Sequence, residues 1–275
     1  MWLNRNSDGK STALVTGGSV GLGLAIAREL VRHDFDVFIC ARTESDLRKA
    51  TEIEPALRAI QADVASGADR ERLLRTIGEQ TGGRPLDCLI NNAAIVRAHD
   101  YLNPFTLKAD RARAEIEINF AAPIELIRLY LAGRLADGPA AIVNIGTPGA
   151  LFPLDANLLY SASKAGLHMF TMALRRQLAQ SPIKVIEVFP PALDTGLANQ
   201  LDVASQAANG QDAIDSVARE TVAGILNGTE VILAHEQSRQ LYEMIPQLDS
   251  AFVDQINAGV KRRKGWDSEP VGAAP

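Results

Sequence analysis

Residues 12–23 have the sequence TALVTGGSVGLG, and this stretch decides the fold. Its first five residues, TALVT, form a short apolar run typical of a buried strand, and a glycine-rich turn follows at once. From Leu22 to about Arg32 the apolar residues recur at helical spacing. A strand, a glycine turn and a helix N-terminus in this order predict a cradle for a phosphate group, because the backbone amides can approach the anion closely.

Each glycine of this turn has a predicted role. Gly17 permits the tight turn, Gly21 lets the backbone approach a pyrophosphate, and Gly23 lets the helix pack against the strand. Ser19 and Leu22 complete the predicted cradle. The spacing is GxxxGxG rather than GxGxxG, so an ordinary glycine turn without a ligand is the alternative interpretation.

Strands and helices alternate along the rest of the chain. The patterns predict strands at residues 36–41, 57–61, 86–91, 141–145, 183–189 and 230–233, and helices at 69–80, 111–135, 158–179, 213–226 and 238–260. Strict alternation predicts the α/β class: one Rossmann-type domain whose doubly wound parallel sheet of about seven strands has helices on both faces. We expect a polar leader at residues 1–11, this domain at 12–260 and a tail at 261–275.

Composition and charge exclude several function classes. The chain of 275 residues is 47% hydrophobic and 22% charged, with a net charge of -5 that does not favour nucleic-acid binding. The basic run at residues 261–264 fits a solvated helix end. No stretch approaches the roughly 18 apolar residues of a membrane span, and the N-terminus lacks the apolar core of a signal peptide. We therefore expect a cytoplasmic protein without membrane association.

Cysteines and histidines show no metal-site pattern. Cys40 and Cys88 lie in predicted strands and are expected to be buried thiols. The four histidines lack metal-ligand spacing, so no metal site is expected. For His168, one helical turn after Lys164, we expect a packing or interface role.

The pair Tyr160 and Lys164 carries the predicted chemistry. Both lie in the predicted helix at 158–179, four residues apart, so they share one helix face. A phenol with a pKa of about 10 needs a shift of about three units, roughly 4 kcal/mol, to act as an acid near neutral pH. One nearby cation supplies about one to three units, so Lys164 alone is marginal and a second positive charge, such as an oxidised nicotinamide, would complete the shift. An ordinary surface helix is the alternative interpretation.

The end of the second strand indicates the cofactor. A site for NAD usually places an acid there to bind the ribose hydroxyls, whereas a site for NADP places an arginine nearby. Here Ala41 occupies that position and Arg42 follows, which favours NADP(H). The alternative is a solvent-exposed arginine that opens the next helix.

Residues 190–212 form the one long irregular connection that the sequence predicts. Such loops are often lids, and this one leaves the carboxyl end of a strand, where ligands of parallel sheets bind. A floppy surface loop would have the same length.

Together these residues resemble the short-chain dehydrogenases/reductases over residues 10–260. The signatures that carry the resemblance are TGGSVGLG at 16–23, Asp63-Val64, NNAA at 91–94, Asn119, YSASK at 160–164 and PPALDT at 190–195. Within the family, ARTESDL at 41–47 and YSASKAGLHMF at 160–170 resemble a bacterial subgroup that includes the oxidoreductase of D-alanylation operons.

The resemblance implies roles for individual residues. It implies that Tyr160 donates the proton, that Lys164 binds the nicotinamide ribose and lowers the tyrosine pKa, and that Asn119 holds a water in a proton relay. The implied cofactor contacts are Asp63 and Val64 at the adenine, Asn91 and Ala93 on the ribose side, and Pro190, Leu193 and Thr195 at the nicotinamide carboxamide. The resemblance also implies a homodimer or homotetramer built on the helices at 111–135 and 160–180.

One position departs from the family pattern. Family members usually have a serine thirteen residues before the tyrosine, and here that residue is Thr147. Threonine keeps a hydroxyl that can donate to an oxyanion, but it adds a methyl group, and Pro148 removes a backbone donor beside it. We expect a catalytic Thr147, with a structural loop residue as the alternative.

These observations predict an NADP(H)-dependent carbonyl reductase or alcohol dehydrogenase acting on a small molecule. Ile95, Phe152, Leu154 and Pro191 form the expected pocket wall, so the substrate should have a hydrophobic body. A lyase, isomerase or tailoring enzyme that uses the same tyrosine is the second hypothesis, and a non-catalytic NADP-binding regulator is the third.

Overall fold

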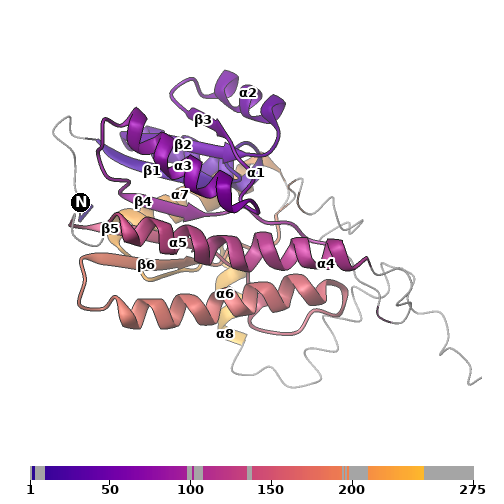
Figure 1. Ribbon diagram of the computed structural model, residues 1–275. Coiled ribbons are helices and arrows are strands. Elements are labelled where there is room, and N and C mark those ends of the chain that lie inside the picture. Colours follow the sequence, from indigo (N-terminus) through magenta and orange to yellow (C-terminus); the bar gives the residue numbers. More distant parts are fainter. Residues whose placement is uncertain are drawn as a thin grey trace, which may run out of the picture.

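Seven parallel strands form one sheet in the order β3-β2-β1-β4-β5-β6-β7. This computed structural model describes residues 2–3, 10–97, 101, 108–134, 138–193, 195, 197 and 210–244 (Figure 1). The strands are β1 (Ser11–Thr16), β2 (Phe35–Ala41), β3 (Arg58–Gln61), β4 (Cys88–Asn91), β5 (Ala140–Ile145), β6 (Ile183–Val188) and β7 (Val231–Ile232). The order reverses between β1 and β4, so the predicted doubly wound parallel sheet is confirmed.

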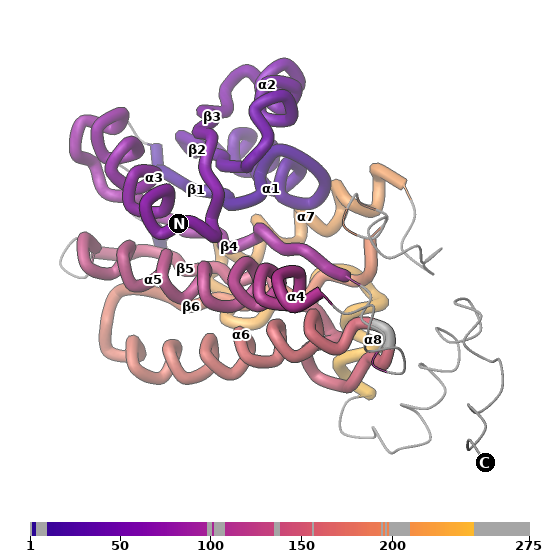
Figure 2. Tube along the Cα trace, turned by 45° about the vertical axis from the view of Figure 1, so that its right-hand side comes forward, coloured from indigo at the N-terminus to yellow at the C-terminus, as the bar shows by residue number. Residues whose placement is uncertain are grey.

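Helices cover both faces of this sheet (Figures 1 and 2). They are α1 (Gly21–Arg32), α2 (Glu44–Ile53), α3 (Gly67–Gln80), α4 (Ala109–Ile116), α5 (Ala122–Ala132), α6 (Leu158–Gln177), α7 (Gln211–Asn227) and α8 (Glu236–Met244). One apolar core joins the sheet to α1, α2 and α7, and a second joins it to α3, α5 and α6. Strand alternation places neighbouring residues in different cores: Ile39 belongs to the first and Cys40 to the second. Both cysteines are free and buried, as expected.

The helix predicted at 111–135 is interrupted. A π-helical turn, Glu117–Ala121, separates α4 from α5 and contains Asn119. Pro123 supplies the physical reason, because it has no N–H to donate to the carbonyl of Asn119 and so breaks the regular α-helical hydrogen-bond ladder. The Asn119 carbonyl is therefore left without an α-helical partner. A proline inside an apolar helical pattern was the sequence signal for this turn.

Three neighbouring strands each have a polar residue at the same register, and these residues form a row beneath α6. Asn91 on β4 is aligned with Asn144 on β5, and Asn144 is aligned with Glu187 on β6. Asn91 Nδ2 donates to Asn144 Oδ1 (2.9 Å), and Asn144 Nδ2 donates to Thr171 Oγ1 of α6 (2.8 Å). Glu187 contacts His168 of the same helix. Helix α6 is therefore held on the sheet at a defined position by buried polar contacts as well as by apolar packing.

Two residues depart from the expected polar leader. Leu3 is buried in the first core, and Trp2 Nε1 donates to the carbonyl of Ile225 on α7 (2.9 Å). The ammonium of Lys184 lies 4.9 Å from the Trp2 ring centroid. The start of the chain thus packs against α7 and β6.

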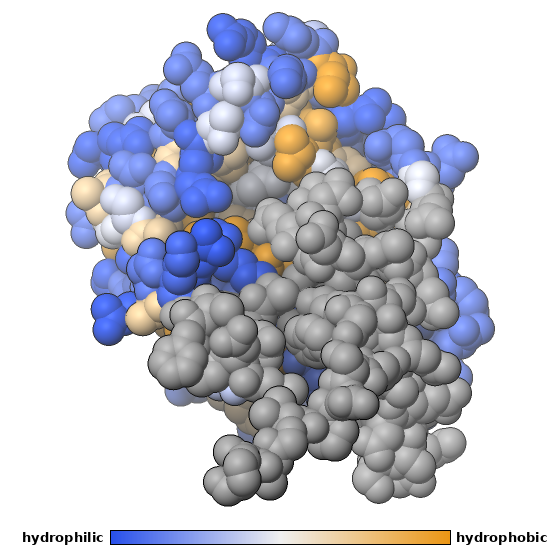
Figure 3. Space-filling view, turned by 90° about the vertical axis from the view of Figure 1, so that its right-hand side faces the viewer, coloured by the Kyte–Doolittle hydropathy of each residue, from blue (hydrophilic) through white to orange (hydrophobic). Residues whose placement is uncertain are grey.

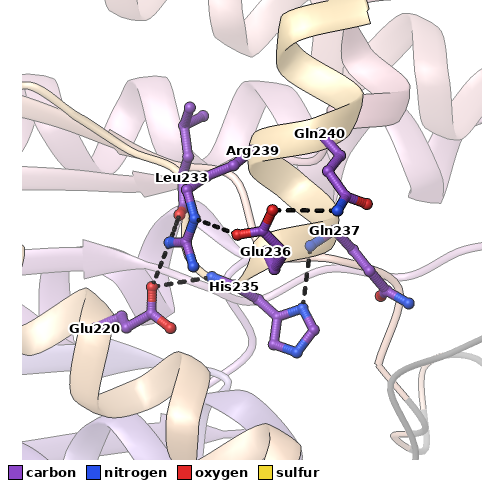
Figure 4. Close-up of polar contacts among 7 residues, drawn as sticks. All are labelled: Glu220, Leu233, His235, Glu236, Gln237, Arg239 and Gln240. Carbon is purple, nitrogen blue, oxygen red and sulfur yellow. Dashed lines mark hydrogen bonds and ion pairs between the residues drawn. The ribbon is translucent and has the colours of Figure 1, made fainter.

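A polar cluster joins α7 to α8 (Figure 4). Arg239 Nη1 donates to Glu220 Oε2 (2.8 Å) and to the Leu233 carbonyl (3.0 Å), and the backbone N–H of His235 donates to the same Glu220 oxygen (3.1 Å). The rest of the helix predicted at 238–260 lies outside the described residues. Across the described part of the face in Figure 3 the surface is mostly hydrophilic, with separate hydrophobic residues.

Candidate active site

A cavity of about 540 Å³ lies at the carboxyl ends of the strands, beside the point where the strand order reverses. Its lining combines the glycine turn, the segment after β2, the segments after β4 and β5, and two residues of α6. The predicted site residues that line it are Gly17, Ser19, Gly21, Leu22, Gly23, Arg42, Asp63, Val64, Ala93, Ile95, Thr147, Leu154, Tyr160, Lys164, Pro190, Pro191, Leu193 and Thr195. Residues far apart in the sequence therefore meet in one cavity.

The glycine turn fits its predicted shape. Gly17 and Gly21 have φ angles of 63° and 56°, a region that other residues rarely adopt. A Cβ atom added at Gly23 would collide with the carbonyl oxygen of Gly17 and with Nδ2 of Asn92. Helix α1 begins at Gly21 and faces the cavity with its N-terminus, so the turn can hold an anionic group.

Thr16 and Asn92 brace this turn. Thr16 Oγ1 accepts hydrogen bonds from the backbone N–H groups of Asn92 (3.0 Å) and Ala93 (3.1 Å). In return, Asn92 Nδ2 donates to the carbonyls of Thr16 (2.9 Å) and Gly17 (3.1 Å). Neither residue was predicted as part of the site, although the second asparagine of NNAA was the available signal.

Asn91 does not line the cavity. It is the last residue of β4, and its side chain lies on the sheet face against Asn144, 3% exposed. Asn92 and Ala93 follow the strand and face the cavity instead. The structure therefore separates Asn91 from the predicted ribose-side contact because strand alternation turns its side chain toward α6.

Arg42 lines the end of the cavity next to α2, together with Thr43 and Asp46. Arg42 is exposed, and its backbone carbonyl accepts from Gln61 Nε2 (2.9 Å). Among the residues that the structure describes, no carboxylate forms an ion pair with the Arg42 guanidinium. Asp63 forms the neighbouring wall, where its Oδ1 accepts from the Ala65 N–H (2.9 Å) and fixes the turn after β3.

Lys164 is buried at the cavity wall. Its Nζ donates to the carbonyl of Ile145, the last residue of β5, at 2.7 Å. Burial lowers the pKa of Lys164 to about 8, and the negative charge of Glu187 opposes this decrease. Lys164 can therefore change its protonation state near physiological pH.

Tyr160 lies one turn earlier on α6 and lines the same cavity. Burial raises its pKa to about 12, and the negative charge of Glu115 adds to the increase. Burial dominates the environment of the phenol, and the lowered tyrosine pKa that the resemblance implies stays a prediction for the complex with an oxidised nicotinamide.

Thr147 can act as a donor. It precedes the 3₁₀ turn Pro148–Ala150, and its Oγ1 accepts from the Gly149 N–H (3.3 Å). Because this contact uses an oxygen lone pair, the hydroxyl proton stays available for a ligand in the cavity.

Both polar atoms of the Asn119 side chain form hydrogen bonds within the protein. Its Oδ1 accepts from the Ile95 N–H (2.9 Å), and its Nδ2 donates to the Ile95 carbonyl (2.8 Å) and to Ser163 Oγ (3.3 Å). Asn119 is fully buried and does not line the cavity. Its side chain fixes the segment after β4, and the water that the resemblance assigns to Asn119 stays a prediction.

Phe152 lies apart from the other expected pocket residues. It lines a second cavity of about 430 Å³ together with Leu158 and Ala162, and Leu154 lines both cavities. The loop expected as a lid is described only at residues 190–193, 195, 197 and 210–212, and the rest lies outside the described residues.

The described ranges contain neither a membrane-spanning helix nor a cluster of metal ligands. None of the helices there is long and apolar enough to cross a membrane. The same ranges contain no group of three or more His, Cys, Asp or Glu side chains that could hold a metal ion.

Known proteins share this sequence and fold. "Uncharacterized oxidoreductase DltE" of Bacillus subtilis (strain 168) is 37% identical over 187 residues, which cover 68% of this chain and 73% of that protein. "Ketoacyl reductase HetN" of Nostoc sp. (strain PCC 7120) is 31% identical over 255 residues, which cover 89% of this chain and 87% of HetN.

Solved structures agree on the fold. A short chain dehydrogenase from Burkholderia cenocepacia J2315 in complex with NADP superposes with a TM-score of 0.75 at 21% identity, covering 90% of this chain and 97% of that one. Other solved structures of the fold contain NADPH, NADH or NAD. The model of the short chain dehydrogenase family matches residues 11–206. With its sheet, glycine turn and Tyr160–Lys164 pair, this chain belongs to the short-chain dehydrogenase/reductase family of oxidoreductases.

Proposed function

We propose that this protein transfers hydride between NADP(H) and a carbonyl or alcohol substrate, with Tyr160 as the general acid and base. One observation carries the proposal: the glycine turn and the Tyr160, Lys164 and Thr147 side chains line a single cavity. A phosphate cradle and an acid–base group in one cavity are what a nicotinamide-dependent reaction on a small molecule requires.

The residues around the cavity fit the cofactor. The positive-φ glycines and the N-terminus of α1 would hold its phosphates, and Asp63 and Val64 would contact its adenine. At the other end, Pro190, Leu193 and Thr195 would hold the carboxamide, and Ala93 and Lys164 the ribose. When bound, the cofactor supplies or accepts the hydride.

Tyr160 and Thr147 would act on the substrate oxygen. Burial raises the pKa of Tyr160, so its phenol carries a proton at neutral pH; with Lys164 and the bound cofactor lowering that pKa, it would donate the proton to the substrate oxygen. Thr147 would donate its free hydroxyl proton to the same oxygen. Lys164 would stabilise the tyrosinate that forms, and a water on the Asn119 carbonyl would resupply the proton.

The proposed preference for NADP(H) rests on Arg42. Its guanidinium has no described carboxylate partner and lies beside the adenine end of the cavity, where a 2′-phosphate would approach. Arg42→Ala should weaken NADPH binding at least about tenfold relative to NADH. Arg48→Ala, an exposed α2 arginine outside the cavity, is the matched control. Equal losses for both cofactors would remove the proposed preference.

We further propose a substrate with a hydrophobic body. Ile95, Leu154, Pro191 and Leu193 give the substrate end of the cavity mostly apolar walls. The ketoacyl reductase name of the HetN relative supports a carbonyl substrate.

Labelled cofactor tests the reaction. The protein is incubated with NADPH that carries deuteride at C4 and with a panel of ketones, aldehydes and enones, and the products are analysed by mass spectrometry. Deuterium in an alcohol product is expected, and Tyr160→Phe should abolish it. Tight NADPH binding without labelled product would favour the alternative, in which Tyr160 serves a lyase, isomerase or tailoring reaction.

The proposed assembly is a homodimer or homotetramer built on α4, α5 and α6. Ile116 of α4 and Leu158 and Met169 of α6 expose 36%, 41% and 62% of their surface. Large apolar side chains exposed on adjoining helices are typical of an interface between copies.

A further inference from the structure

A buried carboxylate lies directly behind the cavity. Glu187 of β6 is 1% exposed, and its Oε2 lies 2.8 Å from Nδ1 of His168 on α6. Its other oxygen faces Gly146, where an added Cβ atom would lie 3.2 Å from Oε1. Gly146 lines the cavity, so Glu187 sits behind the cavity wall without entering it.

The same location holds the ammonium of Lys164. Lys164 donates to the carbonyl of Ile145, the residue directly before Gly146. His168 follows Lys164 by four residues, so both side chains leave α6 on one face. The carboxylate, the imidazole and the ammonium therefore gather between one face of α6 and the ends of β5 and β6.

We propose that Glu187, held in place by His168, is a positioning residue that keeps Lys164 protonated and thereby sets the pH range over which Tyr160 can work. This inference rests on the proposed function. It also replaces the packing role that the sequence analysis expected for His168.

Few other charges compete for this role. Within the part of the chain that the structure describes, the titratable groups around Lys164 and its neighbours are Tyr160 and His168 on α6, Glu187 on β6 and Glu115 on α4. Glu117 of the π-helical turn is paired with Arg70, and Asp155 lines the second cavity. Strand β5 and the 3₁₀ turn after Thr147 have no titratable side chains.

The protonation state of Lys164 depends on a balance between burial and charge. Moving an ammonium out of water favours its neutral form, and a nearby carboxylate favours its charged form. Burial lowers the pKa of Lys164 to about 8, and among the described residues the Glu187 carboxylate is the charge that opposes this decrease. Without Glu187, Lys164 would lose its proton closer to neutral pH and could no longer stabilise a tyrosinate.

His168 keeps the carboxylate in position. With a proton on Nδ1, its ring donates to Glu187 in either protonation state, so Glu187 is not left unpaired in the interior. Phe189 packs edge-on against the His168 ring at a centroid distance of 5.7 Å and limits the ring's movement.

Direct titration of Lys164 tests the proposal. The chain has seven lysines, so NMR of protein labelled with ¹³C at the lysine ε-carbon resolves each titration, and Lys164→Met assigns the signal. Glu187→Gln keeps the shape and can still accept from His168, but it removes the charge. We expect the Lys164 midpoint to fall by about one pH unit or more. Glu230 is an exposed carboxylate directly before β7, so Glu230→Gln is the control and should leave the Lys164 midpoint unchanged.

The outcomes are separable from those of the proposed function, because the titration uses cofactor-free protein without substrate. Equal midpoints in Glu187→Gln and Glu230→Gln would overturn the proposal even if hydride transfer is demonstrated. Glu187→Asp, which restores the charge, should return the midpoint toward the wild-type value; failure to do so in a folded protein would also contradict it. In turnover, Glu187→Gln should move the alkaline limb of the kcat/KM profile to lower pH, a change that a purely structural residue would not produce.

Discussion

The ammonium of Lys164 donates a 2.7 Å hydrogen bond to the carbonyl oxygen of Ile145. Ile145 ends β5 and lines the cavity, so the ammonium is held at the end of the strand. The proposed reaction uses that charge, whereas the fold does not depend on it, because a buried ammonium is costly to desolvate.

Lys164→Met should therefore separate activity from stability. We expect kcat/KM to fall at least about 100-fold and the melting temperature to stay equal or increase, because the apolar side chain fills the same space. Steady-state kinetics and thermal melting measure the two effects. Lys49→Met, on the exposed side of α2, is the control, and a Lys164→Met protein with wild-type activity would contradict the assignment.

The side chain of Asn119 should act mainly on stability. Asn119→Ala leaves the backbone N–H and carbonyl of Ile95 without their partners in the interior, so we expect a loss of about 3 kcal/mol in the free energy of unfolding. Urea denaturation measures it. Ser163→Ala removes only the 3.3 Å contact to Asn119 and the bond to the Tyr160 carbonyl, so it should cost about 1 kcal/mol. Equal losses in both variants would show that the Ile95 contacts contribute little.

Substitution of Gly23 tests the cradle, and substitution of Gly78, a glycine far from it, is the control. Gly23→Ala would drive a Cβ atom into the Gly17 carbonyl and Asn92, so the turn must shift, and we expect NADPH affinity to fall at least about tenfold. Gly78→Ala in α3 meets nothing within 4 Å and should stabilise the protein by about 0.5–1 kcal/mol. Calorimetry of binding and denaturant unfolding compare the two. Unchanged NADPH binding in Gly23→Ala would contradict the cradle.

The sequence predicted the sheet more fully than the site. Alternating apolar runs fix strands and helices locally, and parallel strands bring their carboxyl ends to one edge, so Gly17, Tyr160 and Pro190 could be placed together in advance. Charge and burial could not be placed in this way. The pKa of Tyr160 depends on its burial and on Glu115, forty-five residues earlier, which no spacing rule connects.

The direction of individual side chains was the second feature of the site that could not be predicted from the sequence. Asn91 and Asn92 are adjacent, yet one faces α6 and the other faces the cavity, because β4 ends between them. A shift of one residue in the predicted strand end exchanges these roles. The polar row of Asn91, Asn144 and Glu187 likewise becomes visible only when the register of three strands is known.

The α7–α8 cluster in Figure 4 should stabilise the protein in a pH-dependent way. Burial opposes ionisation of Glu220, but hydrogen bonds from the His235 N–H and Arg239 outweigh it and lower the Glu220 pKa. A carboxylate with a lowered pKa contributes stability above its unfolded pKa of about 4.3 and loses that contribution as the pH falls through its folded value.

Arg239→Ala should reveal this dependence. At pH 7 we expect Arg239→Ala to melt at a lower temperature than the wild type, and the difference should shrink below pH 4, where Glu220 becomes protonated. Thermal melting of both proteins from pH 3 to 8 measures it. Arg128→Ala, which breaks a more exposed pair with Glu125, should change stability by less than about 0.5 kcal/mol at every pH. A constant Arg239→Ala deficit from pH 3 to 8 would show that Glu220 is not the titrating group.

The exposed apolar face of α6 tests the proposed assembly. Met169 is 62% exposed on that face, and Ile53 of α2 is similarly exposed at 56% on a different part of the surface. If copies associate through α6, Met169→Glu places a charge in the interface, and size-exclusion chromatography with light scattering should show a smaller assembly at micromolar concentration. Ile53→Glu should leave the assembly unchanged. If Met169→Glu keeps the wild-type mass while remaining folded, α6 is not the contact between copies, and the apolar side chains on it need another explanation.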